Sequence, residues 1–377
     1  MADHQHVRAV AARLPKVQLH LHLDGSLSEH FIAERAAARG VALPCAPSAL
    51  RRFLVAAKQR HVATNSHSQP RNANWPVFDF CNRFLQTEHE LCDATRQLVS
   101  ELVRLNTWVI ELRFCPLLHL NEGLSPHQVV AAVVRGYRTA VQHAPLPFGV
   151  RGGIILCALR SHDAHRVRQV CELAKSWLGR GVIALDLAGD EPSYPLRTHA
   201  HALLDARQSG VPLTIHAGEG FFEASVDNVL TALEIGAHRI GHGLVIASSD
   251  ELCSRMRSTY IETCITANCN SEQKVKPDRF DLHPVRTFIR RGLKVAAFNC
   301  DNMLLSGTVA SRSHPVEELV RAKTACALGW TSIAEVLLNG ARASFDPSIF
   351  GSATDSHFIS AFKEAVEAIL EPPALKP

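Results

Sequence analysis

Two histidines separated by one residue, His20 and His22, have a spacing that could support chemistry. They lie in LPKVQLHLHLDGS (residues 14–26), where apolar and polar residues alternate. A period of two is typical of a strand, so both imidazoles should point to one face, with Asp24 following on that face. Imidazole nitrogen and carboxylate oxygen are ligands that a zinc-type ion accepts. The alternative is a polar strand face whose histidines only form hydrogen bonds.

The composition narrows the classes of protein to consider. The chain has 377 residues, 46% of them hydrophobic, so it can bury a large core. The net charge is +4 with scattered basic residues, and neither nucleic acid nor a membrane surface is an expected partner. The eleven cysteines are dispersed in a chain too long to need disulfides, and no apolar run of about 18 residues occurs. We therefore expect a cytoplasmic protein.

Eight short apolar segments alternate with helical patterns along the chain. Helical connections favour parallel pairing, and eight strands close a (β/α)8 TIM barrel of the α/β class. An open doubly wound sheet is the alternative, but no Gly-x-Gly-x-x-Gly turn follows the first strand. The expected strands are residues 14–26, 109–114, 152–159, 182–191, 212–220, 238–243, 260–266 and 293–302. The expected helices are residues 28–39, 78–89, 93–105, 164–178, 198–209, 225–233, 284–291, 316–328 and 332–343.

Two regions add to the barrel. Residues 28–105 form an expected helical insertion that covers the site as a lid, and helices within residues 315–377 are expected to pack outside the barrel. Inside the insertion, residues 41–75 are expected to be irregular, and their polar part, residues 64–75, indicates a mobile loop or an insertion. No second core of independent pattern follows, so residues 1–377 are expected to form one domain.

Further polar side chains occur where the expected strands end. His216 and Glu219 follow the fifth strand, His242 the sixth, and Asp301 with Asn302 the eighth. Each has an ordinary explanation, such as a core histidine, a turn residue or a helix cap. Because chemistry in this fold lies at the carboxyl ends of the strands, their joint position predicts one site. Three or more nitrogen ligands, one carboxylate and an open position suit a hydrolytic metal centre.

Six segments taken together resemble the adenosine deaminase family of metal-dependent hydrolases. They are LPKVQLHLHLDGS, VIELRFCP, DLAGDE, HAGEG, RIGHG and NCDN, in the family's order, and the resemblance extends from residue 14 to near residue 345. The resemblance implies one Zn²⁺ per chain. The implied metal ligands are His20, His22, His216 and Asp301.

The resemblance also implies roles for the residues around the metal. Glu219 is similar to the family's general acid, and His242 to the residue that holds the attacking water. Asp24 is similar to the carboxylate that meets a sugar hydroxyl, and Gly189 to the glycine whose amide meets a purine ring nitrogen. The implied substrate-binding residues are His22, Asp24, Gly189 and Asn302.

The implied reaction is hydrolytic removal of the 6-amino group of adenosine or a modified adenine nucleoside or nucleotide, with release of ammonia. A carboxylate at Asp24 repels a 5′-phosphate and favours a nucleoside. The alternatives are action on adenine base, N6-methyl-AMP or another amino-heterocycle, and a zinc-binding homologue without turnover, against which an intact Glu219 argues. The expected partner is a small-molecule purine nucleoside or nucleotide, and the expected state is a monomer or weak homo-oligomer.

Three departures from the family pattern bear on the substrate more than on the chemistry. Gln18 stands where glutamate is more usual, residues 264–268 (CITAN) lack a usual proline, and Asn302-Met303 replace a second aspartate and a proline. A zinc site of the cytidine-deaminase type is excluded because no P-C-x-x-C segment occurs. Three cysteines are better explained as small buried residues than as zinc ligands: Cys264, Cys269 and Cys300.

Overall fold

Eight parallel strands follow one another around a barrel in chain order. The computed structural model describes residues 2–64, 75–142, 144–270, 274–350 and 356–371. Two four-stranded sheets have the orders β1-β2-β3-β4 and β5-β6-β7-β8, and all of their pairings are parallel. The (β/α)8 architecture predicted from the sequence is confirmed. The strands are β1 (Lys16–His22), β2 (Thr107–Phe114), β3 (Arg151–Leu159), β4 (Val182–Ala188), β5 (Thr214–Ala217), β6 (Arg239–His242), β7 (Tyr260–Thr263) and β8 (Val295–Phe298).

Two backbone contacts join the sheets into a closed ring. Leu185 of β4 pairs with Leu213, just before β5, and β1 pairs with Asp301, just after β8. At this second seam the amide of His22 donates to the carbonyl oxygen of Asp301 at 2.8 Å. The amide of Asp301 donates to the carbonyl oxygen of His20 at 2.9 Å. The first and last strands are therefore held together at residues that were expected to bind the metal.

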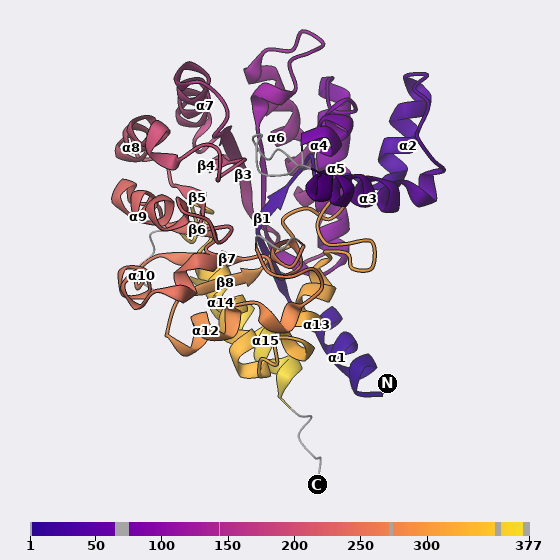
Figure 1. The fold of residues 1–377 in the computed structure, drawn as a ribbon. Helices are drawn as coiled ribbons and strands as arrows, with labels where there is room; N and C mark the ends of the chain where they lie inside the picture. The colour runs from indigo at the N-terminus through magenta and orange to yellow at the C-terminus, as the bar shows by residue number, and fades with distance from the viewer. Residues whose placement is uncertain (1, 65–74, 143, 271–273, 351–355, 372–377) are drawn as a thin grey trace.

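Helices form an outer layer around the strands (Figure 1). One of them, α14, packs against both β1 and β8. A Cβ atom added at Gly340 of α14 would lie 2.9 Å from the Cβ of Ala297 and 3.1 Å from a methyl of Val17, so glycine permits this close approach. The helices are α1 (Ala2–Arg13), α2 (Glu29–Ala38), α3 (Leu50–Thr64), α4 (Trp75–Asn82), α5 (Glu88–Arg104), α6 (Pro126–Gln142), α7 (Ala164–Trp177), α8 (Ala200–Gln208), α9 (Ser225–Ile235), α10 (Asp250–Arg255), α11 (Ile265–Asn268), α12 (Val285–Arg290), α13 (Pro315–Thr324), α14 (Trp330–Arg342) and α15 (His357–Leu370).

The insertion between β1 and β2 is more helical than the sequence indicated. Helix α3 occupies residues 50–64, a stretch that was expected to be irregular, so that prediction was wrong. Its sequence, LRRFLVAAKQRHVAT, is rich in helix-forming residues and has no glycine or proline. The remainder of the expected mobile loop, residues 65–74, lies outside the described residues.

The boundary between the two helices predicted over residues 78–89 and 93–105 lies earlier than expected, because a capping box starts the second helix. Helix α4 ends at Asn82, and α5 begins after Thr87. The Thr87 hydroxyl accepts the amide of Glu90 at 3.2 Å, and the Glu90 carboxylate accepts the amide of Thr87 at 3.1 Å. Helices α1 and α6 were also missed.

The strands supply a core that contains charged as well as apolar side chains. Strand β2 is buried along its whole length, as its run TWVIELRF suggests, yet it contributes Glu111 and Arg113 to the interior. Buried charges need charged partners. Glu111 pairs with Arg239, and Arg113 pairs with carboxylates that contact the histidines of the site described below. Within the described part of the chain, no helix has the length and apolar character needed to cross a membrane.

Candidate active site at the carboxyl ends of the strands

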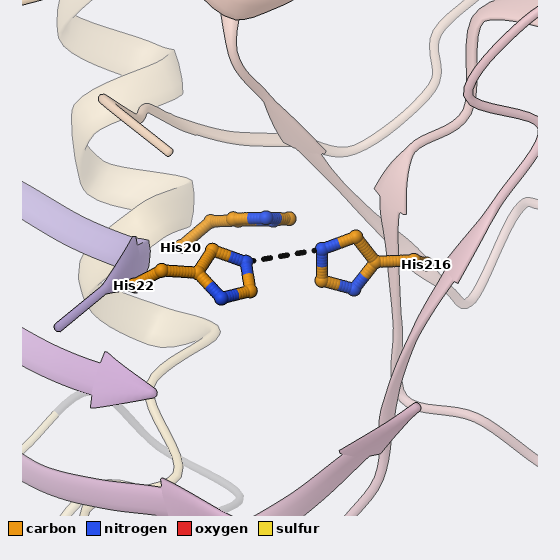
Figure 2. A group of neighbouring side chains, drawn as sticks. All are labelled: His20, His22 and His216. Atoms are coloured by element: carbon orange, nitrogen blue, oxygen red, sulfur yellow. Dashed lines mark hydrogen bonds between the residues drawn. The ribbon is translucent and has the colours of Figure 1, made fainter. Parts of the chain in front are cut away.

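Three histidines from two strands converge inside the barrel rim. His20 and His22 come from β1 and His216 from β5, and their rings face one another (Figure 2). The Nε2 atoms of His22 and His216 are 3.2 Å apart. Oδ1 of Asp301 lies 3.5 Å from Nε2 of His20 and 3.6 Å from Nε2 of His22. The structure therefore brings together all four residues that the sequence predicted as metal ligands.

His242 lies against the same cluster. Its ring centroid is 4.7 Å from that of His20 and 5.2 Å from that of His216. Among the described residues, two groups place their ligand atoms within 4.8 Å of one another: His20 with His22 and His216, and His20 with His242 and Asp301. Cys264, Cys269 and Cys300, which were expected to be small buried residues, belong to neither group and are buried with free thiols.

Buried carboxylates form hydrogen bonds with the Nδ1 atoms of two of the histidines, on the side away from the centre of the site. Nδ1 of His20 lies 2.8 Å from Glu262, and Nδ1 of His216 lies 3.0 Å from Asp186. Arg113 joins the two carboxylates, with contacts of 2.9 Å to Glu262 and 3.0 Å to Asp186. Because a carboxylate accepts the proton on Nδ1, each ring is left with the Nε2 lone pair directed into the site.

The environment shifts the pKa values of the cluster in opposite directions. Burial and the charge of Arg113 lower the pKa of His20, but the neighbouring carboxylates of Asp301 and Glu262 raise it above its ordinary value overall. Burial holds the pKa of His22 well below its ordinary value, and the attraction of Asp301 only partly opposes this. Burial lowers the pKa of His242 to about 3. His22 and His242 are therefore neutral near pH 7.

Glu219 follows β5 and makes an ion pair that the sequence did not predict. Oε1 of Glu219 contacts Nζ of Lys274 and lies 3.6 Å from Nε2 of His242. Burial alone would raise the pKa of Glu219, but the ammonium of Lys274 holds it well below its ordinary value. The loop is fixed by Glu191, whose carboxylate accepts the amides of Gly218 and Glu219 at 2.7 and 2.9 Å.

A directional chain of hydrogen bonds fixes the tautomer of His242. The backbone amide of Val285 donates to Nδ1 of His283 at 3.1 Å, so the proton of neutral His283 is on Nε2. That nitrogen donates to Oδ1 of Asn268 at 3.1 Å, and Nδ2 of Asn268 donates to Nδ1 of His242 at 3.0 Å. Neutral His242 therefore carries its proton on Nε2, on the side of Glu219.

Two residues of the site have left-handed backbone conformations, although neither is glycine. His242 has φ 68° and Asp301 has φ 60°. Such conformations cost about 1–3 kcal/mol each and persist only where the surrounding structure enforces them. His242 ends β6 and Asp301 lies three residues after the end of β8, so both left-handed residues lie at the carboxyl ends of strands, beside the histidine cluster.

The residues expected to bind substrate occupy different strand ends. Asp24 follows β1, is buried, and accepts the amide of Gly25 at 3.1 Å; burial raises its pKa to about 6. Gly189 follows β4 with φ 109°. The side chain of Asn302 packs on Gly25, where an added Cβ would lie 1.6 Å from its Oδ1. That Oδ1 is buried without a hydrogen-bond partner among the described residues.

The departure at Gln18 has a structural explanation. Its Nε2 donates to the carbonyl oxygen of Phe298 at 3.1 Å, and its Oε1 accepts the amide of Cys300 at 2.9 Å. The side chain is buried at the seam between β1 and β8 and does not contact the histidine cluster in any described hydrogen bond. An ionised glutamate could not donate the first of these bonds.

Sequence reasoning missed most of the residues that hold the site in place. Three of them carry a recognisable signal, a charged residue within an otherwise apolar strand: Arg113, Asp186 and Glu262. Lys274, Asn268 and His283 carry none, because their importance depends on how the segment after β7 folds back over the barrel rim.

Comparisons with known proteins agree with this architecture. The family model described as Adenosine deaminase matches residues 15–350. An adenosine deaminase of Clostridium kluyveri is 30% identical over 335 residues, covering 88% of this chain and 90% of the relative. One from Clostridium botulinum is 31% identical over 341 residues, covering 89% and 94%.

Solved structures share the fold at lower sequence identity. An N6-mAMP deaminase of Arabidopsis has a TM-score of 0.76 at 19% identity, covering 95% of this chain and 99% of that protein. A Burkholderia ambifaria amidohydrolase with bound Zn has a TM-score of 0.77 at 22% identity, covering 96% and 94%. The family match extends over all eight strands of the barrel and beyond α14. The chain therefore belongs to the adenosine deaminase family and is a hydrolase that acts on carbon–nitrogen bonds.

Proposed function

We propose that the protein is a zinc-dependent hydrolase that replaces the 6-amino group of an adenine nucleoside or nucleotide with a 6-oxo group and releases ammonia. The observation that carries the proposal is the convergence of ring nitrogens and one carboxylate beside Glu219 at the strand ends. A metal ligand set and a proton donor are both required to hydrolyse an amine from an aromatic ring.

The donor set fits a zinc-type ion. Nε2 of His20 is buried without a hydrogen-bond partner among the described residues, and Glu262 behind it leaves a lone pair on that atom. The facing Nε2 atoms of His22 and His216 are 3.2 Å apart, close enough for both to bind the same ion. We assign His20, His22, His216 and Asp301 as the ligands of one ion. When bound, such an ion lowers the pKa of a coordinated water to about 7 and so supplies a nucleophile.

Three side chains would donate or accept the protons that the reaction transfers: Glu219, His242 and Asp301. Attack at C6 of the purine moves an electron pair to N1, and Glu219 is the carboxyl group that would deliver a proton there. His242 would donate a hydrogen bond from Nε2 to the attacking oxygen, because its tautomer places the proton on that nitrogen. It cannot act as a base in this tautomer, so Asp301 is left to accept the water proton.

Three further residues would orient the purine nucleoside. The amide of Gly189 would meet a ring nitrogen, and Asp24 would accept a hydrogen bond from a sugar hydroxyl. With Oδ1 of Asn302 packed on Gly25, its Nδ2 is directed away from that glycine and would donate to N7. An asparagine can donate there at any pH, whereas a carboxyl group must first be protonated.

The proposal is tested by assaying the purified enzyme, with its metal content measured by mass spectrometry. Adenosine, AMP, N6-methyl-AMP and adenine should be supplied separately, with 6-oxo product and released amine both quantified. We expect turnover of at least one adenine compound and about one zinc per chain, both lost in His20→Ala. The exposed His30→Ala is the matched control. Absence of turnover on all four compounds by the zinc-loaded enzyme would refute the proposal.

A further inference from the structure

Two lysines bring positive charge to the carboxylates of the site. Lys274 lies in the segment after β7, and its Nζ contacts Oε1 of Glu219. Lys58 lies on α3, in the insertion after β1, and its Nζ donates to the carbonyl oxygen of Leu305 at 3.1 Å. Leu305 belongs to the segment that follows Asp301. Segments far apart in the sequence thus place two half-buried ammonium groups at one rim of the barrel.

The two ammonium groups influence one another and the same carboxylates. Burial, together with the charge of Lys274, lowers the pKa of Lys58 to about 8, although Asp301 and Glu219 act in the opposite direction. Among the described residues, no carboxylate is in ion-pair contact with Lys58, and Leu305 takes one of its N–H donors. A half-buried ammonium of this kind has hydrogen bonds and charge available for an anion.

Lys274 contacts one oxygen of the carboxyl group that the proposed reaction requires. Its Nζ lies against Oε1 of Glu219. An ammonium group stabilises the ionised carboxylate and so opposes the protonated form that could donate to N1. A substrate that gives Lys274 another anionic partner would therefore favour the protonated form of Glu219.

We propose that the substrate is an adenine compound with an anionic substituent, a phosphate or a carboxylate, which Lys58 and Lys274 bind. This inference rests on the proposed deamination. The anion replaces Glu219 as the partner of Lys274 and thereby frees the carboxyl group to face the ring. The preference for a nucleoside was expected from the negative charge of Asp24. The two lysines beside Glu219 add positive charge to the site, and this charge favours an anionic substrate.

The substituent can have two sources, and the assay separates them. AMP carries its anion at the 5′ end of the ribose, whereas N6-carboxymethyladenosine carries a carboxylate next to the reacting carbon. Hydrolysis of the second compound adds water at C6 and releases glycine in place of ammonia, with the same 6-oxo product. We expect kcat/KM for at least one of them to exceed that for adenosine by roughly 10-fold or more, the usual effect of a hydrogen bond to a charged group.

Lysine variants test which side chains make the difference. In Lys274→Met and in Lys58→Met, the ratio of kcat/KM for the preferred anionic compound to that for adenosine should fall roughly 10- to 100-fold. Lys274→Arg and Lys58→Arg keep the charge and should retain most of the ratio. Lys175→Met, which removes a surface ammonium on α7, is the matched control and should leave the ratio unchanged. Circular dichroism verifies that each variant is folded.

The outcomes separate this inference from the proposed function. Adenosine as the best substrate, or a ratio insensitive to both lysine-to-methionine changes, would overturn the anion site while leaving deamination intact. If no adenine compound is hydrolysed, the proposed function fails, and calorimetry with the same three compounds still tests the site. Tighter binding of an anionic compound that depends on Lys58 and Lys274 would support the site, and equal Kd values would overturn it.

Discussion

Oε2 of Glu262 lies 2.8 Å from Nδ1 of His20, and both side chains are 0% exposed. The same oxygen forms an ion pair with Arg113 at 2.9 Å. The other oxygen, Oε1, forms an ion pair with Arg239 at 2.6 Å. Burial alone would raise the pKa of Glu262, but the two guanidinium groups hold it well below its ordinary value. The ionised Glu262 therefore determines which nitrogen of His20 faces the metal site.

Glu262→Gln should weaken metal binding without abolishing the fold. The amide oxygen can still accept the His20 proton, but the charge that orients and polarises the imidazole is lost, and outer-shell changes of this kind typically cost about 10- to 100-fold in metal affinity. A competitive chelator titration measures the change. Glu111→Gln is the matched control, because Glu111 also pairs with Arg239 at 2.6 Å but has no described hydrogen bond to a histidine. Equal losses of affinity in the two variants would contradict the assigned role of Glu262.

Glu219→Gln should retain the metal and the fold but lose turnover. The amide cannot deliver a proton to N1, and a single acid–base group is commonly worth about 100- to 10,000-fold in rate. Single-turnover rates and metal content measured on the same sample test this. Glu223→Gln, an exposed change in the same loop, should behave as wild type. Near wild-type turnover in Glu219→Gln would assign proton transfer to another residue.

Asn268→Asp should reverse the tautomer of His242. A carboxylate can still accept from His283 but cannot donate to Nδ1 of His242, so the imidazole proton would move to Nδ1. We expect kcat to fall, roughly 10-fold or more, because Nε2 no longer donates to the attacking oxygen. ¹⁵N NMR of the imidazole reports the tautomer directly. Asn268→Ser, whose hydroxyl can donate, should be milder, and an unchanged tautomer in the aspartate variant would refute the proposed chain.

A 7-deaza analogue tests Asn302. If Nδ2 donates to N7, removing that acceptor should cost about 1–3 kcal/mol of transition-state stabilisation, measured as the ratio of kcat/KM values for the paired substrates. In Asn302→Ala the two compounds should become equivalent. A wild-type enzyme that does not distinguish them would show that Asn302 only supports the turn to Ser306, whose hydroxyl accepts its amide at 3.2 Å.

The stability of the protein should rise with pH between about 7 and the ordinary pKa of lysine, partly because of Lys16. This side chain is buried at the start of β1, its Nζ donates to the carbonyl oxygens of Ala12 and Leu14 at 2.8 Å, and burial lowers its pKa to about 7. In that window the unfolded chain binds more protons than the folded one, so the free energy of unfolding increases with pH. Lys16→Met should flatten this slope in urea titrations, whereas the surface change Lys175→Met should not. An identical slope in Lys16→Met would contradict the prediction.

The strand ends and the convergence of the proposed metal ligands could be predicted because they depend on local pattern and on the fold together. The alternation around His20 and His22 fixes their common face, and the closure of eight strands brings His216 and Asp301 to the same rim. Placing these residues at one rim did not require knowledge of the contacts between their segments, because the strands of a (β/α)8 barrel follow one another in the order of the chain.

The remaining features depend on the geometry of particular loops. The ion pair of Lys274 with Glu219 depends on how far the segment after β7 reaches across the rim, and the sequence contains no period or turn signal for that. The hydrogen bonds of Gln18 to Phe298 and Cys300 could not be predicted, because they arise only when the barrel closes. The helix predicted from residue 93 begins at residue 88, because the capping box of Thr87 and Glu90 sets its start.

The backbone seam between β1 and Asp301 also has a consequence for biosynthesis. The ribosome makes His20 and His22 first, His216 midway through the chain, and Asp301 late, and domains form as their segments emerge. Until β8 leaves the exit tunnel, the proposed zinc site lacks its only carboxylate ligand and β1 lacks a neighbour at its open edge. If the proposed site binds zinc as assigned, chains that end before residue 301 should therefore bind it more weakly than the chain of 377 residues, because one of the four ligands is absent.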